Sequence, residues 1–228
     1  MRKLILLLMS FAFLHSNAQT TFNQKLQKEL DSILVADQKY REVLSNTTSA
    51  MSDSLASVYH QSKTNINYYI WTLQTKIDSA NIIRIKQIID QHGYPGKSLV
   101  GTPANEAAFY VIQHSLVIDT YLPIVKKAAE ADELPFRLYA MMLDRSLMEH
   151  NQEQIYGTQA SGFMATNNET GKKQWTVVIW PIKDAKLVNQ RRKQAGFDQT
   201  VEENAKRLGV DYKVLTLQDV KKLKTEIK

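Results

Sequence analysis

The sequence of 228 residues contains no cysteine. It can therefore form no disulfide bond, offer no thiolate to a metal ion and carry no lipid on a cysteine. Glycine and proline are also scarce, with eight and five residues, and all of them lie at Gly93 or beyond it. Because these two residues are the strongest breakers of regular structure, residues 19–92 are predicted to be helical with few interruptions.

Long apolar runs are absent after the N-terminus. At the N-terminus itself, Arg2 and Lys3 precede an apolar run over residues 4–14, and small residues then lead to Ala18. This is the pattern of a secretory signal peptide, predicted over residues 1–18 with cleavage after Ala18. The run is too short for a membrane span, which needs about 20 apolar residues. We therefore expect an exported protein, periplasmic or extracellular, without a transmembrane segment.

Features of several common functional classes are missing. The net charge is +6, but no clustered basic patch with aromatic or glycine-rich partners is present, so nucleic-acid binding is not predicted. No two histidines stand at the i, i+4 spacing of a helical metal site, and neither a metal nor another cofactor is predicted. Gly96-Lys97-Ser98 matches the end of a phosphate-binding loop, but Gln91 replaces the first glycine and a helix precedes it. We expect a simple turn there.

The periodicity of apolar residues predicts the fold of the first part of the chain. They recur every three or four positions over residues 22–44 and 51–77, which is the period of an amphipathic helix. Residues 46–49 are expected to break the helix, because their side chains compete for backbone hydrogen bonds. A short connection favours an antiparallel helical hairpin over residues 19–78, with a coiled-coil homodimer as the alternative.

Residues 79–212 are predicted to form the core domain of a mainly α, multi-helix protein. Segments rich in β-branched and aromatic residues at 152–159 and 174–182 predict one small β-hairpin at about 152–182, with a long loop. Further helices are expected at 81–92, from Thr102-Pro103, from residue 119 or 120, from Pro135 to about His150, and again from about Asp184.

The end of the chain, residues 213–228, is lysine-rich and is predicted to be a basic C-terminal helix or tail. Thr200 and Thr216 each begin a sequence with the spacing of a helix capping box.

Polar residues that interrupt apolar helix faces are the candidates for function. Burying a charge is costly unless it is paired, so these residues should find partners. One interpretation is a set of structural ion pairs, and the other is a polar pocket with His114 as acid or base and an arginine holding an anion. The candidate binding residues are Asp37, Arg41, Gln113, Arg145, Tyr156, Gln159, Arg191 and Arg192, and the candidate catalytic residues are His114 and Asp144.

Several of these residues belong to short motif blocks that occur in a fixed order: Gly93-Tyr94-Pro95, Leu99-Val100-Gly101, Gln113-His114, Asp144-Arg145, Gln154 to Gln159, Pro181 to Asp184, Arg191-Arg192 and Gly196-Phe197. In these blocks the chain, from Ile82 to about Asp211, resembles a family of bacterial proteins known only as a domain of unknown function. Residues 37–41 resemble that family's N-terminal helix, and residues 47–76 resemble an insertion. The resemblance implies that the polar blocks meet in space, and it implies no activity.

Two functional hypotheses follow. The first is a non-enzymatic binding or interaction module for an envelope protein or a small anionic ligand, because no complete catalytic motif accompanies the long hairpin. The alternative is a hydrolase in which His114 is the general acid/base, Asp144 orients it, and Arg145 or Arg41 holds an anionic group.

Overall fold

The computed structural model describes residues 22–46, 48–166 and 171–225. The predicted signal peptide, residues 1–18, lies outside these described residues. The chain is mainly α-helical with one small β-hairpin, as predicted. Its elements are α1 (Gln24–Asn46), α2 (Ser49–Val58), α3 (Ile66–His92), α4 (Lys97–Val100), η1 (Ala104–Glu106), α5 (Ala107–Gln113), α6 (Ile118–Glu130), α7 (Phe136–Glu149), β1 (Ala160–Thr166), β2 (Lys173–Ile179), η2 (Ala185–Leu187), α8 (Val188–Gln194), α9 (Val201–Arg207) and α10 (Leu217–Thr225).

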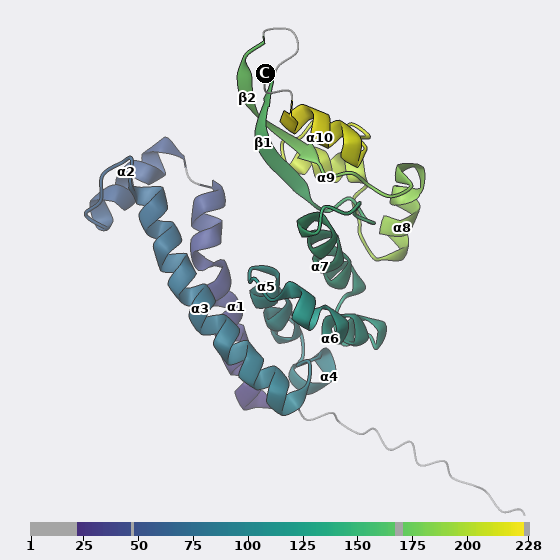
Figure 1. Ribbon diagram of the computed structural model, residues 1–228. Coiled ribbons are helices and arrows are strands. Elements are labelled where there is room, and N and C mark those ends of the chain that lie inside the picture. The colour runs from purple at the N-terminus through teal and green to yellow at the C-terminus, as the bar shows by residue number, and fades with distance from the viewer. Residues whose placement is uncertain (1–21, 47, 167–170, 226–228) are drawn as a thin grey trace, which may run out of the picture.

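Helices α1 and α3 lie side by side and antiparallel, and α2 connects them at the far tip (Figure 1). The predicted helical hairpin is therefore present, but its elements differ from the prediction. The expected helix over 51–77 is interrupted after α2 by a turn in which His60 has a positive φ of 52°. The expected domain boundary at residue 78 falls inside α3, which runs unbroken until Gly93 stops it, because no glycine or proline precedes that point.

The main core lies where α5, α6 and α7 pack against the lower parts of α1 and α3 (Figure 1). Phe109 on α5 is fully buried there, and small side chains at Ala107 and Ala108 are buried beside it. The motif at Gly96-Lys97-Ser98 was expected to be a simple turn, but Gly96 is the N-cap of the short helix α4, which begins at Lys97. The Ser98 N–H donates to the Glu133 carboxylate at 2.8 Å, and a Cβ on Gly96 would collide with the Glu133 side chain.

The β-hairpin pairs β1 and β2 antiparallel, with Ala160 opposite Ile179. The prediction of a first strand at 152–159 is wrong, because side chains from other elements bind the backbone of that segment. Strand β1 was missed because its residues have little β-propensity. Its Gly162 is covered by the ring of Trp175 on β2, which would collide with a Cβ there.

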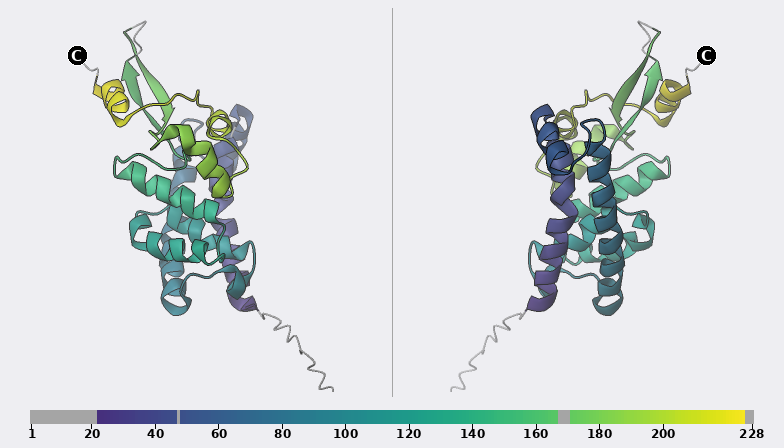
Figure 2. Two further views of the ribbon diagram at one scale, coloured as in Figure 1. Left: turned by 90° about the vertical axis from the view of Figure 1, so that its right-hand side faces the viewer. Right: turned by 90° about the vertical axis from the view of Figure 1, so that its left-hand side faces the viewer.

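The C-terminal elements follow the sequence predictions closely. Thr200 and Glu203 form a reciprocal capping box at α9, and Thr216 and Asp219 bond each other in the same way at α10. Helix α10 lies against β1, with Val220 buried (Figure 2). None of the helices in the described part of the chain is long and apolar enough to cross a membrane.

Candidate functional site

The predicted site residues fall into two clusters, one around an irregular loop and one between α1, α3 and α5. In the loop cluster, Asp144 on α7 is completely buried. Its Oδ1 accepts from the N–H groups of Ile155 at 2.7 Å and Tyr156 at 3.0 Å. Its Oδ2 accepts from the N–H of Thr158 at 3.0 Å and from the hydroxyl of the same residue at 2.9 Å. Burial raises the pKa of Asp144, and these hydrogen bonds oppose the rise.

Two arginines of α8 bind the same loop through its carbonyl groups. Arg191 donates from Nε to the Ile155 carbonyl at 3.0 Å, and Arg192 donates from Nη1 to the Tyr156 carbonyl at 2.9 Å. The loop is therefore held by a carboxylate at its N–H groups and by guanidinium groups at its carbonyls. Asp144, Arg191 and Arg192 meet here as the family resemblance implied, and their shared task is to fix the backbone.

The remaining contacts of the loop also serve to hold it. Gly157 has a φ of 67°, and a Cβ there would lie 2.7 Å from the Val201 side chain. The Gln159 side chain donates to the Thr158 hydroxyl at 3.0 Å, and the Tyr156 ring lies 6.2 Å from the ring of Phe197. Arg145 takes no part in this cluster, because its Nε donates to Glu149 on the same helix at 3.1 Å.

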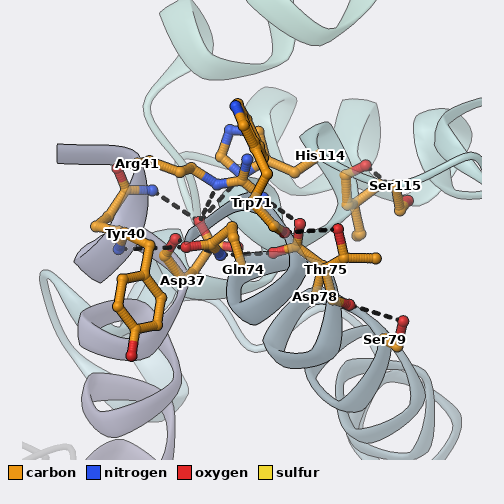
Figure 3. Close-up of polar contacts among 12 residues, drawn as sticks. Asp37, Tyr40, Arg41, Trp71, Gln74, Thr75, Asp78, Ser79, His114 and Ser115 are labelled. Carbon is orange, nitrogen blue, oxygen red and sulfur yellow. Dashed lines mark hydrogen bonds and ion pairs between the residues drawn. The ribbon is translucent and has the colours of Figure 1, made fainter. Parts of the chain in front are cut away.

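The second cluster is shown in Figure 3 and centres on Asp37 of α1. His114, directly after α5, donates from Nδ1 to Asp37 Oδ2 at 3.0 Å. Gln38 Nε2 donates to the same oxygen at 2.7 Å, and Arg41 Nε lies 3.7 Å from it. The other oxygen, Oδ1, is buried without any hydrogen-bond partner. Asp37 is thus a fully buried carboxylate of which one oxygen is unsatisfied.

Helix α3 supplies two further residues of this cluster, Gln74 and Asp78. Arg41 Nη2 donates to Asp78 Oδ2 at 2.6 Å, and Gln74 Nε2 donates to Asp78 Oδ1 at 2.8 Å. Gln74 Nε2 also donates to the Asp37 carbonyl at 3.0 Å, so it joins α1 to α3 (Figure 3). Sequence reasoning missed both residues. The available signal was their position, four residues apart, on a stripe that otherwise carries Ile66, Ile70 and Ile85.

The predicted pairing of His114 with Asp144 does not occur. Asp37 takes the orienting position, while both oxygens of Asp144 are occupied by the loop. The physical reason is the end of α5, which directs His114 towards α1, whereas Asp144 lies on α7 beside the loop. Gln113 is buried next to His114, and its Oε1 has no hydrogen-bond partner.

A surface pocket of about 430 Å³ opens beside His114. Its polar side carries His114 and Asp78, and its rim is apolar, with Leu116 and Val117 exposed. The three hydroxyl groups in its wall all bond to backbone carbonyls: Thr75 to Trp71, Ser79 to Thr75 and Ser115 to Ile112. The pocket therefore combines an apolar entrance with an acidic residue and a histidine whose orientation is fixed.

Metal binding has no support in this geometry. Among the residues that the structure describes, no group of three or more histidine, aspartate or glutamate side chains is arranged to hold a metal ion.

The helical fold and the two polar clusters define a mainly α-helical protein in which a buried aspartate binds a partly exposed histidine beside a small pocket. A family model described as a family of unknown function (DUF6624) matches residues 24–218, and the chain belongs to this family. No curated protein and no solved structure matches the chain.

Proposed function

We propose that the protein is an exported binding module and that its ligand site is the pocket beside His114. The observation that carries this proposal is the Asp37 carboxylate, which is buried with one oxygen unsatisfied although such a group costs stability. Residues kept at a cost to stability are typical of functional sites. The hydroxyl groups of the pocket are all bonded to the backbone, which favours binding over nucleophilic catalysis.

Export is supported by the basic start, the short apolar run and the small residues that end at Ala18. The protein recovered from the envelope or medium of the native cell is expected to begin at Gln19. N-terminal sequencing or intact-mass measurement checks this result. A chain that retains Arg2 and Lys3 would contradict it.

The charges of the pocket indicate the class of ligand. Asp78 lines the pocket, whereas Asp37 and Arg41 belong to the adjoining cluster, in which Arg41 binds Asp78 at 2.6 Å. The two carboxylates outnumber the one guanidinium group. The pocket and its adjoining cluster therefore have a net negative charge when His114 is neutral. A ligand with an apolar body and a cationic or hydrogen-bond-donating head fits an apolar rim above Asp78 and His114.

Benzylamine is a suitable test ligand, with benzoate as the comparison of opposite charge. We expect the mature chain from Gln19 to bind benzylamine in preference to benzoate in isothermal titration. Asp78→Asn is expected to weaken benzylamine binding about tenfold, because one charge-assisted hydrogen bond contributes about 1.5–3 kcal/mol. Asp90→Asn, an exposed change on the same helix, is the matched control and should leave binding within about twofold. Equal binding of benzoate, or equal losses in both variants, would contradict the proposal.

A second function is favoured by one observation, the 3.0 Å hydrogen bond that fixes His114 through Nδ1. This bond leaves Nε2 as the nitrogen able to take a proton from a water molecule in the pocket. In this hydrolase Asp37, rather than Asp144, orients the histidine. Hydrolysis of p-nitrophenyl acetate that disappears in His114→Gln and persists in His150→Gln would select this function over simple binding.

A further inference from the structure

A second pocket, of about 290 Å³, lies between α7, α8, α9 and the loop that Asp144 binds, which contributes Thr158. These elements lie on the opposite side of the molecule from the α1–α3 hairpin in Figure 1. Three arginines from three different helices line the pocket: Arg137, Arg192 and Arg207. Asp198 is the acidic side chain among the lining residues, and it is exposed.

The central arginine is buried against neutral partners. Arg192 is only 2% exposed, and it donates from Nε to the Gln199 carbonyl at 2.8 Å and from Nη1 to the Tyr156 carbonyl. Its guanidinium group also stacks over the Phe197 ring at 4.5 Å. Burial lowers the pKa of Arg192, the negative charge of Asp144 opposes this effect, and the positive charge of Arg207 adds to it. The hydrogen bonds of Arg192 thus go to two uncharged carbonyl groups.

The two outer arginines are also weakly compensated. Arg207 Nη2 donates to the neutral amide oxygen of Asn204 at 2.8 Å. Arg137 reaches Glu106 only at 3.8 Å, and 42% of its side chain is exposed.

The carboxylates that surround the pocket have other partners. Asp144 is occupied by the loop, Glu202 accepts from Asn189 at 2.9 Å, and Glu203 caps α9. Among the side chains that line the pocket, three arginines outnumber one aspartate, so the lining itself carries an excess of positive charge.

We propose that this pocket binds a phosphoryl group, either as inorganic phosphate or as a small phosphomonoester. A phosphoryl group presents three strong acceptor oxygens, and three guanidinium groups from three helices match that number of acceptors. Arginine is suited to this task because its planar fork donates two parallel hydrogen bonds and stays charged. The small volume favours a phosphoryl group with a short substituent over a polymer.

The site is separate from the pocket beside His114, so either proposal can fail alone. The mature chain from Gln19 is titrated calorimetrically with inorganic phosphate and with glycerol 3-phosphate at a fixed ionic strength set by chloride. Phosphatidylglycerol vesicles form a third arm, which distinguishes a membrane source of the phosphoryl group from a soluble one. We expect saturable binding of at least one soluble ligand, and preference between the two tells which form the site takes.

The decisive comparison is between two single-charge changes. Arg207→Gln is expected to weaken binding about tenfold, whereas Lys193→Gln, which removes an exposed charge from α8, should change it less than about twofold. Arg137→Gln gives an independent test on another helix, and circular dichroism verifies that each variant is folded. Equal losses for Arg207 and Lys193, acetate binding as tight as phosphate, or binding to the vesicles alone would overturn the proposal.

Discussion

Asp144→Asn is expected to lower the free energy of unfolding by about 3–5 kcal/mol. Four groups donate hydrogen bonds to this carboxylate, three backbone N–H groups and one hydroxyl. An asparagine offers one acceptor oxygen and one amide group, which itself donates. Whichever way the amide is turned, backbone N–H groups of the loop lose their acceptor, and Arg192 loses the negative charge nearest to it.

Urea denaturation of the mature chain, followed by circular dichroism, measures this loss. Glu149→Gln is the matched control, because it removes a carboxylate from the same helix but only breaks an exposed pair with Arg145. We expect the control to change stability by less than about 1 kcal/mol. A loss at Asp144 as small as that of the control would mean that the loop does not depend on the carboxylate, and that Asp144 serves function instead.

The loop cluster explains why several polar motif blocks accompany one another in this chain. Residues 154–159 belong to no helix or strand, so the partners of their backbone groups must come largely from other elements. Asp144 binds the N–H groups, Arg191 and Arg192 bind carbonyls, and Asn204 donates to the Gly157 carbonyl at 3.1 Å. Thr158 of this loop also lines the pocket of Arg137, Arg192 and Arg207, which we call the arginine pocket. These contacts therefore also fix the position of a residue that lines that pocket.

Short sequence patterns correctly predicted the structural features that depend only on residues close together in the chain. Both capping boxes are found where their spacing placed them, because four consecutive residues suffice to form one. The mainly helical class followed from periodicity and from the absence of early glycine and proline. Strand β1 was not predicted, because Ala160, Ser161 and Gly162 have little β-propensity and the strand depends on its pairing with β2.

Several members of the candidate site were predictable from the sequence, whereas Gln74, Asp78 and the pairing of the residues were not. Burying an unpaired charge is costly, so polar partners were expected for Asp37, Arg41, His114 and Asp144. Each of them has a hydrogen-bond partner in the structure. Spacing along a helix cannot tell which partner is met, since His114 and Asp37 are 77 residues apart in the chain. The pairing depends on the tertiary position of α5 against α1, which periodicity does not specify.

Asp37→Asn is expected to have the opposite effect to Asp144→Asn, a gain in stability of about 0.5–2 kcal/mol. Both aspartates are fully buried, but only Asp37 has an oxygen without a partner. An asparagine keeps one carbonyl oxygen for Gln38 and His114, and it places its amide nitrogen where the unsatisfied oxygen lies. The cost of burying the charge disappears, while Arg41 retains its bond to Asp78.

The same urea titration measures this gain, with Asp31→Asn on α1 as the control that should stay within about 0.5 kcal/mol. Because the carboxylate orients His114 and adds negative charge beside the pocket, the variant should also bind benzylamine more weakly. Greater stability together with weaker binding is what a residue retained for function produces. A loss of stability at Asp37 comparable to that at Asp144 would instead make the Asp37–His114 contact a structural bond between α1 and α5, and the search for the ligand site would move to the arginine pocket.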